Sequence, residues 1–365
     1  MDIKGVEKVW KNDLTGLLNI NYPIIQAPMA GGPTTSELVA AVSNAGGLGM
    51  IGAGYMSPEQ LRHQIDEIRK LTDHPFGINL FVPTEYTADA GKLQAANTLL
   101  QPIKEELQVE DELVLPTFEQ DLKTFQEHLN VIIEEEISIC SFTFGIPSPR
   151  IVSKLKEYSI VLIGTATTVE EAVMNENAGM DAVVIQGSEA GGHRGTFNGQ
   201  DRESLIGLMS LIPQVADVIS IPLIAAGGIM DGRGIMAAKC LGAIGVQMGT
   251  AFLVCEESGA NTLHKEAIIK ASEDKVVLTK AFSGKMARGL HNRFIEMTKP
   301  YEEVLPDYPL QNELTKAIRK TSAAKGTTGH MSLWSGQSPR LAKKLTACEL
   351  MNKIINEAES LHPKL

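Results

Sequence analysis

Short apolar runs rich in Val, Ile and Leu recur along the chain, and each ends near a Gly or Pro before a segment with helical spacing. Continuous apolar runs of this length are typical of parallel strands that are covered on both faces and joined by crossover helices. The pattern predicts eight strands, at residues 22–29, 48–53, 76–82, 137–145, 160–166, 181–187, 221–228 and 243–250.

Capping residues mark where the intervening helices begin. The Thr34-Thr35-Ser36 cluster precedes one helix, and Ser57-Pro58 and Ser148-Pro149 each place an N-cap residue before a proline at the first helical position. Thr168, with Glu171 three residues later, predicts a capping box. Strands and helices therefore alternate through the first two thirds of the chain.

Eight strands alternating with helices match an α/β protein of the (β/α)8 TIM-barrel type, in which functional loops follow the carboxyl ends of the strands. A doubly wound open sheet is the alternative. The first strand, however, is not followed by a G-x-G-x-x-G turn, and the glycine-rich turns come after the sixth, seventh and eighth strands. We expect the barrel to be formed by residues 1–82 and 137–255.

Two further segments do not follow this repeat. Residues 83–136 predict an inserted acidic helical segment between the third and fourth strands, and its part from 104 to 136 has eleven acidic residues against Lys104 and Lys123. Apolar positions at helical spacing favour a solvated cover packed by one face, with a lid over the site as the alternative. Residues 256–365 predict a C-terminal helical extension that packs on the barrel mouth.

Composition narrows the classes of partner. The 365-residue chain has a formal net charge of −11, whereas nucleic-acid-binding proteins normally present a basic surface. The amino-terminal segment has no continuous apolar stretch followed by a cleavage site, and no later apolar run of membrane-spanning length is free of charges and glycines. We expect a cytoplasmic protein that binds neither nucleic acid nor membranes, and a homo-oligomer is compatible with the sequence.

The four cysteines are widely spaced, and no second His or Cys stands at ligand spacing from His193, so no metal site is predicted. The glycine-rich turns instead predict an anion site. Gly227 and Gly228 follow an apolar strand and precede a helix, and Gly249 and Thr250 repeat this arrangement one strand later. Exposed backbone N–H groups after strands seven and eight are the usual phosphate site of such barrels. We therefore expect a phosphorylated cofactor or substrate; glycines required only for tight turns are the alternative.

Four side-chain amides stand inside or at the ends of apolar strands, at Gln26, Asn79, Gln186 and Gln247. An unpaired buried amide costs about 1 to 3 kcal/mol, so each requires a partner. Satisfied core amides would explain one or two of them. Four amides at one rim favour a flat ligand rich in heteroatoms, such as an isoalloxazine.

The segment IQGSEAGGHRG, at 185–195, covers the end of the sixth strand and the loop after it, which is rich in glycine and contains His193. Gly191 and the glycine after it allow the backbone to approach a ligand, and His193 could accept a proton or donate a hydrogen bond there. Glu189 and Arg194 could orient the imidazole or pair with each other. A purely structural histidine is the alternative.

In combination, these motifs resemble the class I nitronate monooxygenase family. The resemblance covers nearly the whole chain and rests on QAPMAGG at 26–32, SNAGGLG at 43–49, INLFVP at 78–83, GSEAGGHRG at 187–195, AGGIMDGRG at 226–234, GVQMGTAF at 245–252 and ARGLHNRF at 287–294. It implies a (β/α)8 barrel with FMN as cofactor. It also implies oxidation of an alkyl nitronate, such as propionate 3-nitronate, by O2 to a carbonyl compound and nitrite.

The resemblance further implies a role for individual positions. His193 matches the active-site histidine of the family. The implied FMN contacts are Asn79, Gln186, Gly191, Gly227, Gly228, Gln247, Met248, Gly249 and Thr250.

Other functions remain as alternatives. Flavin-dependent enoyl-acyl-carrier-protein reductases, which use NAD(P)H, also have an EAGGH motif, but QAPMAGG, Arg194 and ARGLHNRF favour the monooxygenase. An IMP-dehydrogenase-like barrel requires a nucleophilic cysteine in a mouth loop, whereas Cys140 falls in a predicted strand and Cys240 in a predicted helix. A noncatalytic flavin-binding protein is a further alternative, in which His193 at the barrel mouth would have no catalytic role.

Overall fold

The computed structural model describes residues 10–110, 113–199 and 204–362, and its centre is a closed ring of parallel strands. The strands follow one another around the ring in the order β1-β9-β8-β6-β5-β4-β3-β2. A parallel bridge between Ile25 and Leu48 joins β1 to the start of β2 and closes the ring. The strands are β1 (Ile24–Gln26), β2 (Gly49–Gly52), β3 (Phe76–Phe81), β4 (Ile139–Thr143), β5 (Val161–Ala166), β6 (Ala182–Gln186), β8 (Leu223–Ala226) and β9 (Gly245–Met248).

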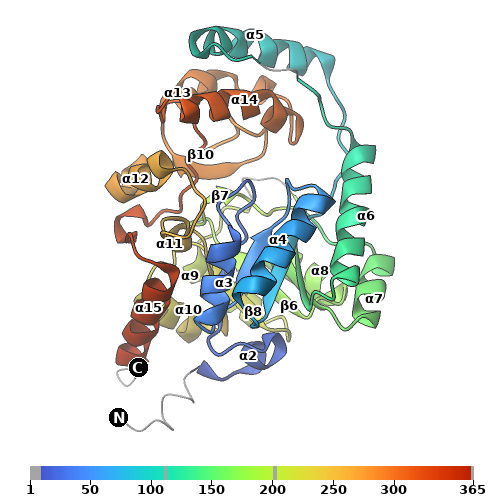
Figure 1. Ribbon diagram of the computed structural model, residues 1–365, viewed down its shortest axis with the longest axis vertical. Helices are drawn as coiled ribbons and strands as arrows, with labels where there is room; N and C mark the ends of the chain where they lie inside the picture. Colours follow the sequence, from blue (N-terminus) through green and yellow to red (C-terminus); the bar gives the residue numbers. More distant parts are fainter. Residues whose placement is uncertain (1–9, 111–112, 200–203, 363–365) are drawn as a thin grey trace.

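The TIM-barrel prediction is therefore confirmed, and each of the eight apolar runs contains one of these strands. Helices surround the ring (Figure 1). They are α3 (Ser36–Asn44), α4 (Pro58–Leu71), α6 (Phe118–Glu134), α7 (Pro149–Glu157), α8 (Val169–Asn177), α9 (Leu208–Ala216), α10 (Gly232–Leu241), α11 (Thr250–Leu253) and α15 (Ala347–Leu361).

The amino-terminal end of the barrel is closed by α2 (Asp13–Leu18). Its Leu14 and Leu18 are almost fully buried and pack with the inward-facing side chains of the strands, among them Ile25, Ile163 and Ile224. Figure 1 places α2 beneath the barrel. The opposite end, where the strands terminate, is the one that remains available for a site.

The capping predictions are confirmed in part. Thr35 and Ser57 accept hydrogen bonds at the starts of α3 and α4, but Ser148 makes no side-chain cap bond. Thr168 caps α8 as predicted, through a bond of 3.2 Å from the Glu171 backbone N–H. The reciprocal half of the predicted capping box is wrong, because the Glu171 carboxylate has other partners.

The Glu171 carboxylate is fully buried and holds the loop that follows His193. One oxygen accepts from the N–H and hydroxyl of Thr167, each at 2.6 Å. The other accepts from the backbone N–H groups of Phe197 and Asn198, at 2.7 and 2.9 Å. A contact between distant segments has thus replaced the local cap.

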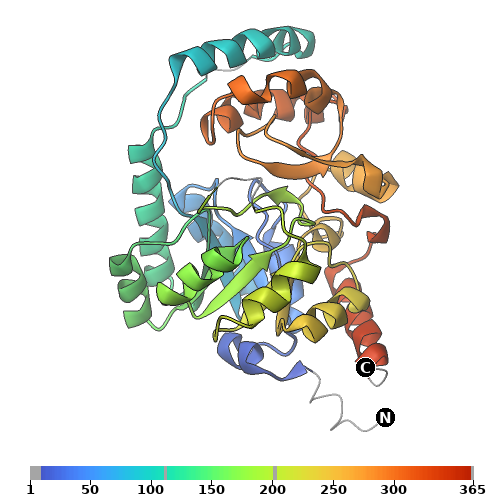
Figure 2. The same ribbon diagram turned by 180° about the vertical axis from the view of Figure 1, so that it is seen from behind.

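The segment between β3 and β4 forms two helices with different neighbours. The second, α6, packs against α4 and β3 on the side of the barrel. The first, α5 (Ala90–Leu107), packs its apolar face on α14 (Leu310–Ala324). Figures 1 and 2 show α5 lying across α14 at the end of the molecule farthest from α2. In the described part of the chain, α5 therefore covers α14, and the lid alternative stays a prediction.

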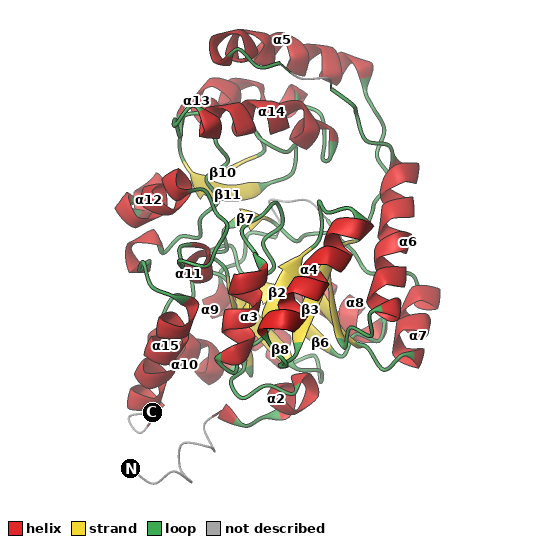
Figure 3. Ribbon diagram, in the orientation of Figure 1, coloured by secondary structure: helices red, strands yellow, loops and turns green. Residues whose placement is uncertain are grey.

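The C-terminal segment adds a small antiparallel sheet above the barrel mouth (Figure 3). Its order is β10-β11-β7, formed by β10 (Val276–Thr279), β11 (Ala287–Leu290) and β7 (Gly192–His193). Around it lie α12 (Thr262–Lys270), α13 (Arg293–Thr298), α14 and the 3-10 turns Glu273–Lys275, Lys299–Val304 and Pro339–Leu341. Since β7 comes from the barrel loop after β6, this sheet joins the two parts of the chain. No helix in the described ranges has the length and apolarity needed to cross a membrane.

Candidate active site

His193 lies just beyond the carboxyl ends of the barrel strands, in β7. It stands opposite Ala287 of β11 in the small sheet. The preceding residue, Gly192, has a φ of 75°, a left-handed conformation that residues with a side chain rarely adopt. The imidazole is therefore held between the barrel and the C-terminal segment.

Ser283 is the hydrogen-bonding partner of His193, with 2.8 Å between Nε2 and Oγ. Ser283 is buried, and its hydroxyl donates to the carbonyl of Lys285 at 3.1 Å. Because a hydroxyl has a single hydrogen, Oγ then accepts from Nε2–H. This assigns the proton of the neutral imidazole to Nε2 and leaves Nδ1 as an acceptor.

Burial lowers the pKa of His193 to about 3, and the positive charges of Lys285 and Arg319 act in the same direction. The imidazole is therefore neutral at neutral pH. Lys285 is itself held in place: its Nζ donates to the carbonyl of Thr196 at 3.0 Å and lies 5.0 Å from the ring centre of Phe144. Two cations beside a neutral imidazole make the site attractive to anions.

Aromatic rings form the walls around His193. The ring centres of Trp334, Tyr308 and Phe144 lie 5.4, 6.0 and 6.1 Å from the imidazole. Phe144 has a φ of 71°, which is unusual for a bulky residue and is often associated with functional sites. Sequence reasoning missed these three residues and Ser283, because they lie on distant segments and no local motif marks them.

Glu189 and Arg194 do not orient the imidazole. The Glu189 carboxylate accepts from the backbone N–H of Leu208 at 2.9 Å, at the start of α9. Arg194 is fully buried and donates to the backbone carbonyls of Gly187 and Gln186, at 2.7 and 2.9 Å. Both side chains shape the turn that carries His193, but the structure gives neither a contact with the ring.

The glycine turns after β8 and β9 present unpaired donors. The backbone N–H groups of Gly227, Gly228, Gly249 and Thr250 donate to no acceptor in the part of the chain that the structure describes. Gly227 and Gly228 have φ values of 134° and 64°. N–H groups that are not well exposed are almost always paired in folded proteins. Unpaired N–H groups on adjacent turns at strand ends can bind an anion.

The segment 335–338, from the C-terminal part of the chain, completes this region. The N–H of Gly336 donates to the hydroxyl of Thr250 at 2.9 Å, and Gln337 N–H donates to the carbonyl of Glu189 at 3.0 Å. A Cβ at Gly191 would lie 2.5 Å from the Gly336 nitrogen. Gly191 is therefore needed for close packing against this segment. The sequence offers one weak signal for it, the glycine-containing SGQS motif after Trp334.

The four amides of the strand ends have different partners. Gln26 is fully buried and satisfied inside the barrel, where its Oε1 accepts from Met50 N–H at 3.0 Å. The Gln186 amide bonds to the backbone of the next loop, with 3.0 Å to the His193 carbonyl and 2.9 Å to Gly195 N–H. Gln26 thus does not belong to a ligand ring, and Gln186 holds the loop of His193.

The other two amides have unused capacity. Asn79 donates from Nδ2 to the hydroxyls of Ser141 and Thr143, at 2.9 and 3.1 Å, and its Oδ1 accepts no hydrogen bond from the described residues. Gln247 is partly exposed, and its amide has no hydrogen-bond partner among those residues. Met248 differs, because its side chain packs in the core and its carbonyl accepts from the N–H of Ala27 at 2.9 Å.

A cysteine nucleophile and a metal site both have little support. Cys140 lies within β4, where burial raises the pKa of its thiol, so it is not an activated nucleophile in a mouth loop. Cys240 lies on α10, as predicted. In the described ranges, no three His, Cys, Asp or Glu side chains are grouped to hold a metal ion.

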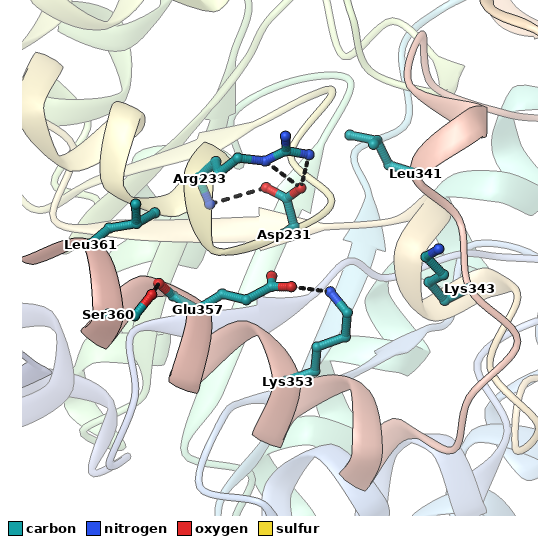
Figure 4. A pocket seen from close by; sticks show the side chains of 8 residues that line it. All are labelled: Asp231, Arg233, Leu341, Lys343, Lys353, Glu357, Ser360 and Leu361. Atoms are coloured by element: carbon teal, nitrogen blue, oxygen red, sulfur yellow. Dashed lines mark hydrogen bonds and ion pairs between the residues drawn. The ribbon is translucent and has the colours of Figure 1, made fainter.

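A surface pocket of about 470 Å³ lies away from the mouth, between α10, α15 and the preceding turn. Four of its charged side chains are already paired, Asp231 with Arg233 and Glu357 with Lys353 (Figure 4). Lys343 stands at its rim. Paired surface charges do not indicate a reaction site, so His193 and the glycine turns remain the candidate.

The family described as "Nitronate monooxygenase" matches residues 11–357 of the chain. This match includes His193, the glycine turns and the Ser283 segment. The chain belongs to the nitronate monooxygenase family. Members of this family are flavin-dependent oxidoreductases, so the protein is an enzyme of that class.

Individual relatives agree with this family assignment. A protein from Staphylococcus aureus (strain Newman), named "Probable nitronate monooxygenase", is 53% identical over 352 residues, which cover 96% of this chain and 98% of that protein. The structure of a nitroalkane oxidase from Streptomyces ansochromogenes has a TM-score of 0.89 and 37% identity, covering 97% of this chain and 99% of that one. The structure of FabK from Thermotoga maritima has a TM-score of 0.77 and 32% identity, with coverage of 97% and 98%.

Proposed function

We propose that the protein uses FMN to oxidise alkyl nitronates, such as propionate 3-nitronate, with O2 as the electron acceptor, giving a carbonyl compound and nitrite. The observation that carries the proposal is the neutral, Ser283-bound imidazole of His193 beside unpaired backbone donors at the barrel mouth. Family membership supports the reaction type. The identity of the flavin, the role of O2 and the products belong to the proposal.

The residues present fit FMN. The unpaired N–H groups of Gly227, Gly228, Gly249 and Thr250 would hold its phosphate. A Cβ at Gly249 would meet only Ala27, at 3.6 Å, so the backbone is open there. Further ligand contacts would come from the Oδ1 of Asn79, the amide of Gln247 and the backbone of Met248. Gln186 and Gly191 would act through the loop and the segment that they position.

The bound flavin would supply the electron transfer, and the chain would supply position and electrostatics. Lys285 and Arg319 favour an anionic substrate near His193. Because Nε2–H donates to Ser283, the neutral ring has no donor left for the nitronate oxygens, and His193 would instead take up a proton at Nδ1. Phe144, Tyr308 and Trp334 would exclude water from that space.

The first test is anaerobic stopped-flow spectroscopy of the FMN-loaded protein, mixed separately with propionate 3-nitronate and with NADPH. A rapid change of flavin absorbance with the nitronate and a slow one with NADPH is the expected result. Fast full reduction by NADPH without any response to the nitronate would instead assign the protein to the enoyl-acyl-carrier-protein reductases.

A second test concerns His193. We expect His193→Ala to retain bound FMN, because the phosphate donors are on other loops, and to lose turnover. Full activity in that variant would remove the catalytic assignment and leave a flavin-binding role. The measurement is the kcat with propionate 3-nitronate, normalised to the flavin content of each preparation.

A further inference from the structure

Glu171 is a buried carboxylate whose partners are all neutral. Its side chain is fully buried, and no Lys, Arg or His within the described ranges lies at ion-pair distance from it. Three of its four partners are the backbone N–H groups of Thr167, Phe197 and Asn198, and the fourth is the Thr167 hydroxyl. Backbone N–H groups can only donate, so both carboxylate oxygens act as acceptors. Glu171 therefore uses all of its hydrogen-bonding capacity to join the end of β5 to the loop after His193.

The hydroxyl of Thr167 extends this arrangement to Thr196. Its Oγ1 lies 2.6 Å from the Glu171 carboxylate and 3.0 Å from the Oγ1 of Thr196. Because the single hydrogen of the Thr167 hydroxyl is donated to Glu171, the Thr167 oxygen accepts from the Thr196 hydroxyl. The N–H groups of the two residues after Thr196 also donate to Glu171. Glu171 thus fixes Thr196 through its side chain and through the backbone that follows it.

Thr196 in turn holds Lys285, whose Nζ donates to the Thr196 carbonyl at 3.0 Å. Lys285 stands two positions after Ser283, the partner of the imidazole, and its positive charge acts on His193. An ammonium on a flexible four-carbon stem keeps one position only where contacts hold it. The loop that Glu171 fastens therefore helps to decide where this cation stands.

We propose that Glu171 is a positioning residue for the reaction: by fixing the Thr196 carbonyl, it places the Lys285 ammonium beside His193, where the cation binds the nitronate anion. The inference rests on the proposed function and adds to it a residue outside the site. Glu171 has no described contact with His193 or Lys285, so its effect passes through Thr196.

The test begins with two single variants. Glu171→Gln keeps the size of the side chain but replaces one acceptor oxygen with an amide that donates, so that N–H groups oppose one another on one side of it. Lys285→Met removes the cation. In Lys285→Met the kcat/KM for propionate 3-nitronate should fall roughly 10- to 100-fold, the equivalent of one charged contact. Glu171→Gln should lose less, and in both variants the loss should lie mostly in KM, because the charge attracts the substrate before and during the reaction.

The double variant separates positioning from a purely structural role. If Glu171 acts through Lys285, adding Glu171→Gln to Lys285→Met should change kcat/KM by less than about twofold. The same cycle is measured without substrate by urea unfolding, where Lys285→Met should shift the midpoint less in the Glu171→Gln protein than in wild type. Losses that multiply in the double variant, or equal midpoint shifts in the two backgrounds, would overturn the inference and leave the proposed function intact. A wild-type protein that oxidises no nitronate would overturn the proposed function, and the urea cycle would still test how Lys285 is held.

Two further variants complete the design. Glu170→Gln is the matched control, because Glu170 is an exposed carboxylate of the same helix, and it should behave as wild type in both assays. Thr196→Val removes the hydroxyl that bonds to Thr167 but keeps the carbonyl that accepts from Lys285, and it serves if Glu171→Gln does not fold. It should lose roughly 2- to 10-fold in kcat/KM, and this loss should disappear in the Lys285→Met background. Flavin content and thermal unfolding report whether each variant is folded.

Discussion

The hydrogen bond between Ser283 and His193 allows a direct test of how the site is held. Ser283→Ala removes the hydroxyl that lies 2.8 Å from Nε2, and with it the group that fixes the position of the proton. Ser283 is 1% exposed, so water cannot easily replace the lost partner. Leaving the ring N–H unpaired costs about 1 to 3 kcal/mol.

If this cost applies to the imidazole when it acts on the substrate, kcat/KM should fall about 5- to 150-fold. The same loss should lower the free energy of unfolding by a similar amount. The assay is steady-state oxidation of propionate 3-nitronate between pH 5 and 9, with urea unfolding of the FMN-loaded protein in parallel. A change in the shape of the pH profile would report altered control of the imidazole proton.

Ser322→Ala supplies the matched control. Ser322 is also buried, and its hydroxyl donates at 2.7 Å to the carbonyl of Thr327, but it has no described contact with His193. It should lose stability in the same range of about 1 to 3 kcal/mol and keep its kcat/KM. Wild-type turnover in Ser283→Ala, or an equal loss of turnover in both variants, would show that the Ser283 hydroxyl does not control the imidazole.

Three other predictions concern cofactor retention, pH and stability. Gly228→Ala should weaken FMN binding, measured by flavin fluorescence, because a side chain at a φ of 64° strains the turn and its Cβ would lie 3.1 Å from Glu189. The control is Gly326→Ala, which has a φ of 72° and open space around it and should leave FMN binding unchanged. The pKa of His193 lies below its unfolded value, so the unfolded chain takes up the proton first as the pH falls. This should cost about 2 kcal/mol of stability between pH 7 and pH 5, a loss that His193→Gln should reduce in urea titrations. Glu171→Ala should lower the free energy of unfolding by about 3 kcal/mol or more, since four donors lose their acceptor, whereas exposed Glu170→Ala should have little effect in the same denaturation assay.

The two parts of the chain differed in how far local pattern could predict them. The barrel strands were predictable, because strands covered on both faces must be apolar throughout and leave a continuous run in the sequence. The acidic segment after β3 was not predictable in its packing. Its helical spacing showed that one face is buried, but only the contacts distinguish α6 on the barrel from α5 on α14.

The side-chain amides of the candidate site also have partners that local pattern could not predict. In the sequence Gln26 and Gln247 are alike, since each is a polar residue in an apolar strand. In the structure the Gln26 amide is hydrogen-bonded to Met50, while the Gln247 amide has no hydrogen-bond partner among the described residues. Whether a buried amide serves the fold or a ligand depends on its neighbours across the ring, which periodicity does not specify.

Local patterns were sufficient to predict the (β/α)8 barrel, the glycine turns after its last strands and a histidine at its mouth, because these follow from apolar runs and from backbone conformations that only glycine adopts easily. The surroundings of that histidine follow only from contacts between distant segments. Ser283, Tyr308 and Arg319 are between 90 and 126 positions away along the chain, and they reach the mouth only because β11 pairs with β7 and α14 packs above it. The tautomer and the electrostatic environment of the imidazole arise from these long-range contacts, which no local pattern in the sequence specifies.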